Sequence, residues 1–256
     1  DCVLEITKLL RHRCLETLKF MSCGISCDPE GLKHVLSAIT TSECRINHEH
    51  SKLVHLNLSG NRITNDDIST LTTMLKNSHG VCLKNLDLGL NNITSVGVST
   101  FCDVMGHESC NQLEVLNLNS SYGIGDDDME ILCRALKEKQ HRLRELHLSR
   151  CSVTSKGTCW LGQVFRDKNC EITHLNIRFN GICDEGVRML CDGFRKGNCE
   201  LDVLNLSHCS LTHACMPDLR KFLEYEKCRL TDLSLSNNNI GDAGVKMLFD
   251  ALRVKK

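Results

Sequence analysis

The stretch LTDLSLSNNNIGDAGVKMLFDAL, residues 230–252, contains two hydrophobic periods in succession. Leu233 and Leu235 alternate with polar residues, which is the period-2 pattern of a short strand with one buried face. After Ile240, apolar residues follow eight and twelve positions on, at Leu248 and Leu252. A separation of four residues places two side chains on one face of a helix. The stretch therefore predicts a strand, a turn and a helix.

The same pattern recurs along the whole chain, and we number its copies as repeats one to eight. They begin at Leu15, Leu53, Leu83, Leu113, Leu143, Ile172, Leu201 and Leu230, at intervals of 38, 30, 30, 30, 29, 29 and 29 residues. The position of Asn238, where a side-chain amide can bond to the backbone as the chain leaves the strand, carries Asn or Cys in every repeat except the fourth, which has Ser. One such unit cannot bury its apolar face alone, but stacked units share a continuous core.

Stacked strand–turn–helix units predict an α/β solenoid with parallel strands on a concave face and helices on a convex face. Because the helix layer is wider than the strand layer, we expect the stack to bend into a horseshoe. We expect a single domain over residues 1–256 that is a fragment of a longer chain. The 38-residue interval adds about eight residues at 44–52, which we expect to form a surface loop, and repeat four has an extra residue near 120–123.

The composition argues against several classes of partner. The 31 basic and 32 acidic residues give a net charge of −1, and aromatics make up 4% of the chain, so neither a polyanionic partner nor base stacking is indicated. We therefore expect no nucleic acid. No apolar run approaches the roughly 20 residues of a membrane helix, and no signal peptide is recognisable, so we expect no membrane association.

The eighteen cysteines recur at equivalent repeat positions, which favours buried, reduced thiols in a cytoplasmic protein over a disulfide scaffold. A zinc site is an alternative for one cluster, because Cys23, Cys27, Cys44, His48 and His50 have loosely zinc-like spacing. Cys23, however, occupies the turn position that we expect to be buried, which favours a structural thiol. We predict no bound metal and no cofactor.

Repeats of this length with full helices resemble the ribonuclease-inhibitor-like leucine-rich repeats. The segments CRLTDLSLSNNNIGDAGVKMLFDAL (228–252) and CELDVLNLSHCSLTHACMPDLRKFL (199–223) are similar to repeats of NACHT-domain innate immune receptors, the NOD-like receptors. A cysteine before the strand is typical of this subclass and occurs at Cys82, Cys110, Cys170, Cys199 and Cys228. The resemblance implies a cytoplasmic, non-enzymatic domain that binds a protein or a pathogen-derived ligand. It also implies regulation of a nucleotide-binding domain that this chain does not contain.

Strand residues that alternate with the leucines are expected to face the concave surface. In repeats five to seven this surface combines histidines, arginines and a phenylalanine, a composition typical of interface hot spots. The candidate binding residues are Glu145, His147, Arg150, His174, Asn176, Arg178, Phe179 and His208. The alternative is an ordinary solvated polar surface. Since no nucleophile with a matched base accompanies the Glu145 and His147 pair, we predict no catalytic residue.

Two other functions remain open for this fold, because a fold does not determine a function. A free-standing inhibitor of a soluble enzyme would need acidic and aromatic residues along the strands, and the strand rows contain few carboxylates, mainly Asp87, Glu145 and Asp232. A GTPase-activating protein of this repeat class would be strongly acidic at one end, in contrast to the near-neutral charge here.

Overall fold

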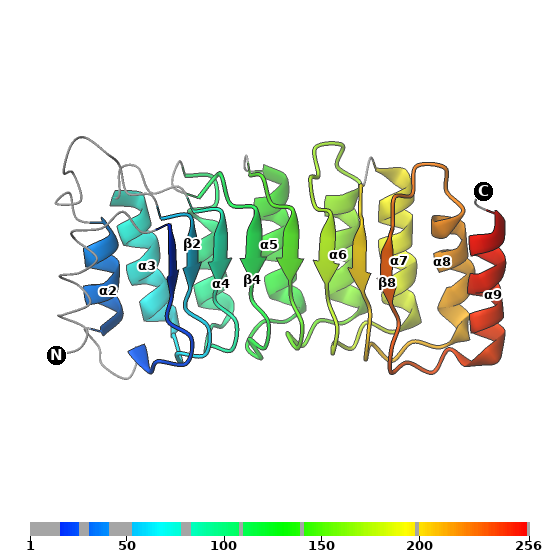
Figure 1. The fold of residues 1–256 in the computed structure, drawn as a ribbon, viewed down its shortest axis with the longest axis horizontal. Coiled ribbons are helices and arrows are strands. Elements are labelled where there is room, and N and C mark those ends of the chain that lie inside the picture. Colours follow the sequence, from blue (N-terminus) through cyan, green and yellow to red (C-terminus); the bar gives the residue numbers. More distant parts are fainter. Residues whose placement is uncertain are drawn as a thin grey trace. The chain divides into compact units, whose positions relative to one another are not determined.

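The computed structural model describes residues 16–25, 31–40, 53–77, 83–107, 110–138, 141–197 and 200–254. Within these ranges, three-residue strands alternate with helices along the chain (Figure 1). The chain divides into two compact units, Asp1–Ser121 with Lys139–Leu143 and Tyr122–Glu138 with Arg144–Lys256. Both units are built from the same repeat and are described separately, so the expectation of a single domain stays a prediction.

The first unit contains four parallel strands in chain order, with one central leucine buried in each. Its elements are β1 (Thr17–Lys19), α2 (Gly31–Thr40), β2 (His55–Asn57), α3 (Asn65–Asn77), β3 (Asn85–Asp87), α4 (Ser95–Cys102) and β4 (Val115–Asn117). The register aligns equivalent residues, with Leu18 opposite Leu56 and Leu56 opposite Leu86. The period-2 pattern in the sequence therefore places one leucine row in the core of this unit.

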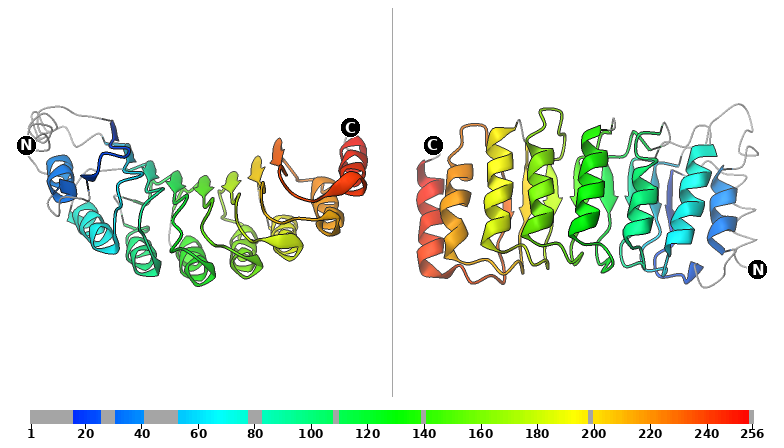
Figure 2. Two further views of the ribbon diagram at one scale, coloured as in Figure 1. Left: turned by 90° about the horizontal axis from the view of Figure 1, so that it is seen from below. Right: turned by 180° about the vertical axis from the view of Figure 1, so that it is seen from behind.

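The second unit repeats the arrangement. Its elements are α5 (Asp126–Glu138), β5 (Glu145–His147), α6 (Ser155–Phe165), β6 (His174–Asn176), α7 (Cys183–Lys196), β7 (Val203–Asn205), the 3-10 turn η4 (His213–Cys215), α8 (Met216–Leu223), β8 (Asp232–Ser234) and α9 (Gly241–Val254). Strands β5 to β8 pair in parallel and in register. In each unit the helices cover one face of the strands and leave the other face open (Figure 2). This confirms the predicted α/β repeat fold.

Buried asparagine amides connect the turn of one repeat to the next repeat. Asn180, 4% exposed, accepts hydrogen bonds at Oδ1 from the backbone N–H groups of Cys151 and Val153, both at 3.0 Å. Its Nδ2 donates to the carbonyls of Leu148 at 2.8 Å and Ile177 at 2.9 Å. Equivalent bonds are made by Asn61, Asn91 and Asn238. The asparagine position predicted from the sequence thus satisfies backbone groups of two neighbouring repeats.

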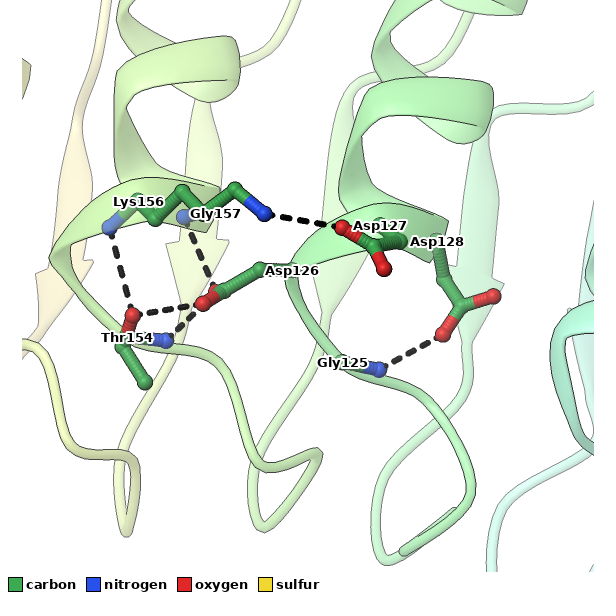
Figure 3. Close-up of polar contacts among 7 residues, drawn as sticks. All are labelled: Gly125, Asp126, Asp127, Asp128, Thr154, Lys156 and Gly157. Atoms are coloured by element: carbon green, nitrogen blue, oxygen red, sulfur yellow. Dashed lines mark hydrogen bonds and ion pairs between the residues drawn. The ribbon is translucent and has the colours of Figure 1, made fainter.

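A second contact connects the start of one helix to the start of the next (Figure 3). The carboxylate of Asp126 accepts bonds from the Thr154 N–H at 2.8 Å, the Thr154 hydroxyl at 2.6 Å and the Gly157 N–H at 2.9 Å. A Cβ at Gly157 would lie 2.6 Å from the Asp126 Oδ1 atom, so glycine is required for this close approach. Asp184 accepts bonds from the N–H and the hydroxyl of Thr212 in the same way. Burial tends to raise the pKa of Asp184, but the hydrogen bonds from Thr212 outweigh burial and lower this pKa.

The terminal repeats depart from the predicted burial. Cys23 was expected to be buried in the turn but is exposed. Leu252 is 57% exposed, whereas Leu223 and Phe194, at the same repeat position, are 6% and 1% exposed. The prediction for Cys23 was wrong, and both exposures have one cause: β1 and β8 are the first and last described strands, so no other described repeat covers their outer sides. The predicted surface loop at 44–52 lies outside the described residues.

Replacing Asn180 by Leu should destabilise the protein, because it leaves two N–H groups and two carbonyls of buried backbone without their partner. Each buried group left unsatisfied costs about 1–3 kcal/mol, so we expect a loss of at least about 3 kcal/mol in the free energy of unfolding. Urea denaturation would measure it. The control is Asn239→Ala, an exposed asparagine, for which a change below about 0.5 kcal/mol is expected. Equal effects of the two substitutions would contradict the role of Asn180.

Candidate binding surface

The open face of the second unit carries a row of polar side chains on β5, β6 and β7. Glu145 lies opposite His174, and His147 lies opposite Asn176 across the parallel register. All four side chains are half-buried on the open face. In each strand the leucine between the two polar residues points into the core, so the polar residues point outward. The structure therefore brings together the strand residues that the sequence analysis named.

A second row lies at the turns that follow these strands. Arg150, Phe179 and His208 each have a positive φ, of 57°, 55° and 54°, a conformation that is unfavourable for residues with a side chain. The N–H of Arg150 donates to the Arg178 carbonyl at 3.1 Å, and that of Phe179 to the Ser207 carbonyl at 2.9 Å. These bonds hold the three turns in one conformation, so the three side chains project from equivalent positions of successive repeats.

The turn row forms a stack of planar groups centred on Phe179. The Phe179 and His208 rings are stacked, with centroids 3.9 Å apart and an interplanar angle of 15°. The guanidinium carbons of Arg150 and Arg178 lie 4.4 and 4.6 Å from the Phe179 centroid, within the range of cation–π contacts. We call Arg150, Arg178, Phe179 and His208 the arginine–aromatic stack. One ring therefore positions two cationic groups.

The positive charge of this stack is not neutralised by neighbouring residues. Among the described residues, neither Arg150 nor Arg178 forms an ion pair, and the buried Nε of Arg178 has no hydrogen-bond partner. Glu145, a carboxylate on the same open face, instead has its Oε2 atom 3.4 Å from the His147 Nε2 atom. The surface thus presents two guanidinium groups that have no ion-pair partner among the described residues, although the buried Nε of Arg178 is not accessible to another molecule.

An open hollow of about 890 Å³ adjoins the stack and shares Phe179 and His208 with it. Its other lining residues carry mainly amides and hydroxyls: Asn180, Gly181, Ser210, Leu211, Thr212, Asn237, Asn238 and Asn239. The sequence analysis did not name Ser210, Thr212 or Asn239. In the sequence, these residues are marked only by their position two to four residues after the turn row. That position does not show whether the surface there is hollow or flat.

The polar contacts on this face do not form a catalytic relay. The Glu145 carboxylate contacts His147, while the Thr173 hydroxyl lies 2.8 Å from the His174 Nδ1 and also 3.3 Å from the Arg144 carbonyl. No hydrogen bond in the described part of the chain joins these two groups. Nor do the described ranges contain a group of three or more His, Cys, Asp or Glu side chains arranged to hold a metal ion. Of the zinc alternative, Cys27, Cys44, His48 and His50 lie outside the described residues.

The second unit contains thiols whose surroundings suppress ionisation. Burial raises the pKa of Cys170 and of Cys209 to about 11 and that of Cys215 to about 12, and it also raises the pKa of Cys191. Only the thiolate is a strong nucleophile, so these groups are unreactive near neutral pH. They serve as small packing side chains, as the sequence analysis expected of most cysteines.

Within the described ranges, every helix is too short or too polar to span a lipid bilayer.

A family model described as "Leucine Rich repeat" matches residues 49–71, 81–102, 168–191 and 227–249. These units are leucine-rich repeats. The leucine-rich-repeat chain is 32% identical over 255 residues to NACHT, LRR and PYD domains-containing protein 14 of Homo sapiens, covering 98% of this chain and 22% of the relative.

Two further relatives are also named as NACHT, LRR and PYD domains-containing proteins. Protein 9 of this series from Bos taurus is 34% identical over 205 residues, covering 80% of the leucine-rich-repeat chain and 20% of the relative. Protein 3 of this series from Homo sapiens is 33% identical over 250 residues, covering 93% of the leucine-rich-repeat chain and 22% of the relative. The predicted resemblance to NACHT-domain receptors is thereby confirmed for the repeats. The chain spans about a fifth of the length of these relatives.

The raised thiol pKa values predict an alkaline loss of stability. The folded state holds protons that the unfolded state releases above the ordinary thiol pKa of 9.0, so the free energy of unfolding should fall as pH rises from about 9 to about 11. Urea denaturation across this range measures the slope. Cys170→Ala with Cys209→Ala should reduce it. If the free energy of unfolding of this variant fell with pH as steeply as that of the unsubstituted protein, the two thiols would not be its cause.

The thiol assignment also predicts the outcome of chemical labelling. Titration under denaturing, non-reducing conditions should find close to the eighteen cysteines of the sequence as thiols. In the folded protein, a maleimide should label the exposed Cys183 faster than the buried Cys191 and Cys209. Mass spectrometry of the labelled peptides distinguishes these sites. Several protected pairs after denaturation would contradict the thiol prediction.

Proposed function

We propose that this chain is the ligand-sensing, protein-binding part of a cytoplasmic receptor that also contains a NACHT domain. The observation that carries the proposal is the arginine–aromatic stack, which places two guanidinium groups without ion pairs on the open face of the second unit. Arginine and aromatic residues dominate the binding energy of protein interfaces, and solenoids bind on the face that their strands leave open. The similarity of the repeats to those of NACHT, LRR and PYD domains-containing proteins supports the same conclusion.

The proposed binding surface consists of Glu145, His147, Arg150, His174, Asn176, Arg178, Phe179 and His208. Binding there changes the contacts between the repeats and a nucleotide-binding domain elsewhere in the receptor, so that the unoccupied repeats are autoinhibitory. A ligand shifts such an equilibrium only by its difference in affinity for the two states. The domain itself performs no chemistry. The described cysteines are thiols rather than disulfides, which supports a cytoplasmic location, where cysteines remain reduced.

An inhibitor of a basic enzyme is the second candidate function, and the carboxylates of the strand rows argue against it. Asp87 already accepts bonds from the Asn57 amide at 3.0 Å and the Gly89 N–H at 2.9 Å. Glu145 contacts His147. Two of the three carboxylates that would face a basic partner are therefore engaged within the chain. A GTPase-activating function has no specific support beyond the shared fold.

Photo-crosslinking tests the proposed surface directly. We would place p-benzoylphenylalanine at Val203, a half-buried residue on the open face, or at Arg195, an exposed residue on helix α7, in the protein expressed in cells. Partner proteins should be crosslinked from position 203 and not from position 195. Mass spectrometry identifies them. Crosslinks formed only from position 195 would assign binding to the helical face.

The variant Arg150→Ala/Arg178→Ala/Phe179→Ala should abolish the crosslinks from position 203. Removal of the stacking contacts should cost only about 1–2 kcal/mol of the free energy of unfolding, because these side chains are half-buried or exposed. Urea denaturation verifies that the variant is folded. Crosslinking that persists unchanged in this folded variant would exclude the stack from the binding surface.

A further inference from the structure

The two guanidinium groups of the arginine–aromatic stack lie beside one ring although their charges repel. Arg150 and Arg178 are 4.4 and 4.6 Å from the Phe179 centroid, and neither has a carboxylate partner among the described residues. Cation–π contacts reduce the cost of this proximity without neutralising the charge. An anion that reaches both groups would therefore gain more than one that meets an isolated surface arginine.

The stack also fixes the geometry in which the anion would be met. A guanidinium beside a ring keeps its N–H groups in its own plane, where they match the two oxygens of a carboxylate. The turn N–H bonds of Arg150 and Phe179 hold the backbone, and the His208 ring covers one face of Phe179 at 3.9 Å. Less side-chain entropy is lost on binding when the donors are already positioned.

The surroundings of the stack favour an extended peptide that carries the carboxylates. The hollow beside Phe179 and His208 is lined by the amides of Asn237 and Asn239 and the hydroxyl of Ser210. Such groups bond to peptide N–H and carbonyl groups and add no further charge. The chain that follows a bound carboxylate can therefore continue over His208 into this hollow.

A nucleic acid fits this surface less well than an acidic peptide. Base stacking needs a free aromatic face, and Phe179 is already covered by His208 and the arginines. A long phosphate backbone would also meet the carboxylate of Glu145 on the same face, whereas no line of basic residues extends the positive charge along the described strands. Carboxylates concentrated in a short segment match the two arginines.

We propose that the arginine–aromatic stack binds an acidic segment of a partner protein, whose carboxylates contact Arg150 and Arg178 and whose backbone continues into the adjacent hollow. The proposal rests on the proposed function, since it specifies the partner of the same surface. Phe179 positions the two arginines, and His208 supports Phe179.

Fluorescence anisotropy with defined peptides tests this assignment. The probe is a fluorescein-labelled peptide of about twelve residues that alternates Glu-Glu with Gly-Ser; the matched peptide has Gln in place of Glu. The Glu peptide should bind at physiological salt and the Gln peptide should not. Arg150→Gln/Arg178→Gln should weaken binding at least about tenfold, as expected for loss of charge-assisted hydrogen bonds. Phe179→Leu should weaken it less, because the charges remain but are no longer held in position.

The matched control removes the same charge from the helical face. Arg134→Gln/Arg195→Gln changes two exposed arginines on α5 and α7 and should alter Glu-peptide binding less than about twofold. Equal weakening by the two double variants would overturn the proposal, because only net charge would then matter. Tighter binding of a phosphoserine peptide or a single-stranded RNA of the same length would also overturn it. So would a Glu peptide that fails to bind.

Crosslinking from position 203 distinguishes this proposal from the proposed function. Loss of the crosslinks in Arg150→Gln/Arg178→Gln but not in Arg134→Gln/Arg195→Gln supports both. Crosslinks that persist in Arg150→Gln/Arg178→Gln would support the surface as a binding site but would contradict an acidic segment as its ligand. Absence of crosslinks from position 203 in the unsubstituted protein contradicts the proposed function, whatever the peptides show.

Discussion

The hydrogen bonds of a few buried amides determine the geometry of the repeats. The turn that leaves each strand exposes backbone N–H and carbonyl groups inside the core, where unpaired polar groups are costly. Asn180 satisfies two N–H groups of the preceding repeat and one carbonyl of each repeat with a single side chain. This arrangement requires the two turns to have the same shape and fixes their separation. Strand register and the positions of the turn side chains both follow from it.

The arginine–aromatic stack is one result of that constraint. Because the turns share a conformation, Arg150, Phe179 and His208 occupy equivalent positions although each has an unfavourable positive φ. The surrounding hydrogen bonds impose this backbone whatever the side chain. The stability of the fold therefore depends little on which residues occupy the turn row. A solenoid can change its surface there without changing its core.

The sequence was sufficient to predict the fold and the rows of the open face, since both depend on periodicity. Leucines at a spacing of two and apolar residues at a spacing of four determine which side chains are buried, and equal intervals place Glu145 beside His174. The sequence could not predict that Arg178 turns toward Phe179, because its direction depends on side-chain torsions that no period records. Nor could it predict the hollow beside His208, whose volume depends on how neighbouring turns diverge in space. The burial of Cys23 was predicted wrongly, because the first and last described repeats carry the same periodic pattern as the repeats between them.

The two kinds of contact between repeats alternate along the second unit. Asp126 connects repeats four and five, Asn180 five and six, Asp184 six and seven, and Asn238 seven and eight. The true structural period of this unit is therefore two repeats. Deleting repeat six alone would bring the turn of Cys151 against Cys209, which has no amide oxygen to accept the N–H bonds that Asn180 accepts. Deleting repeats six and seven together would bring Asn238 into that position and restore the acceptor. Deleting repeat seven alone would also keep an acceptor, because Asn238 would then lie against the turn of Asn180, as Asn91 lies against the turn of Asn61. A change of length therefore preserves these turn hydrogen bonds only where the repeat after the new junction carries an asparagine at this position.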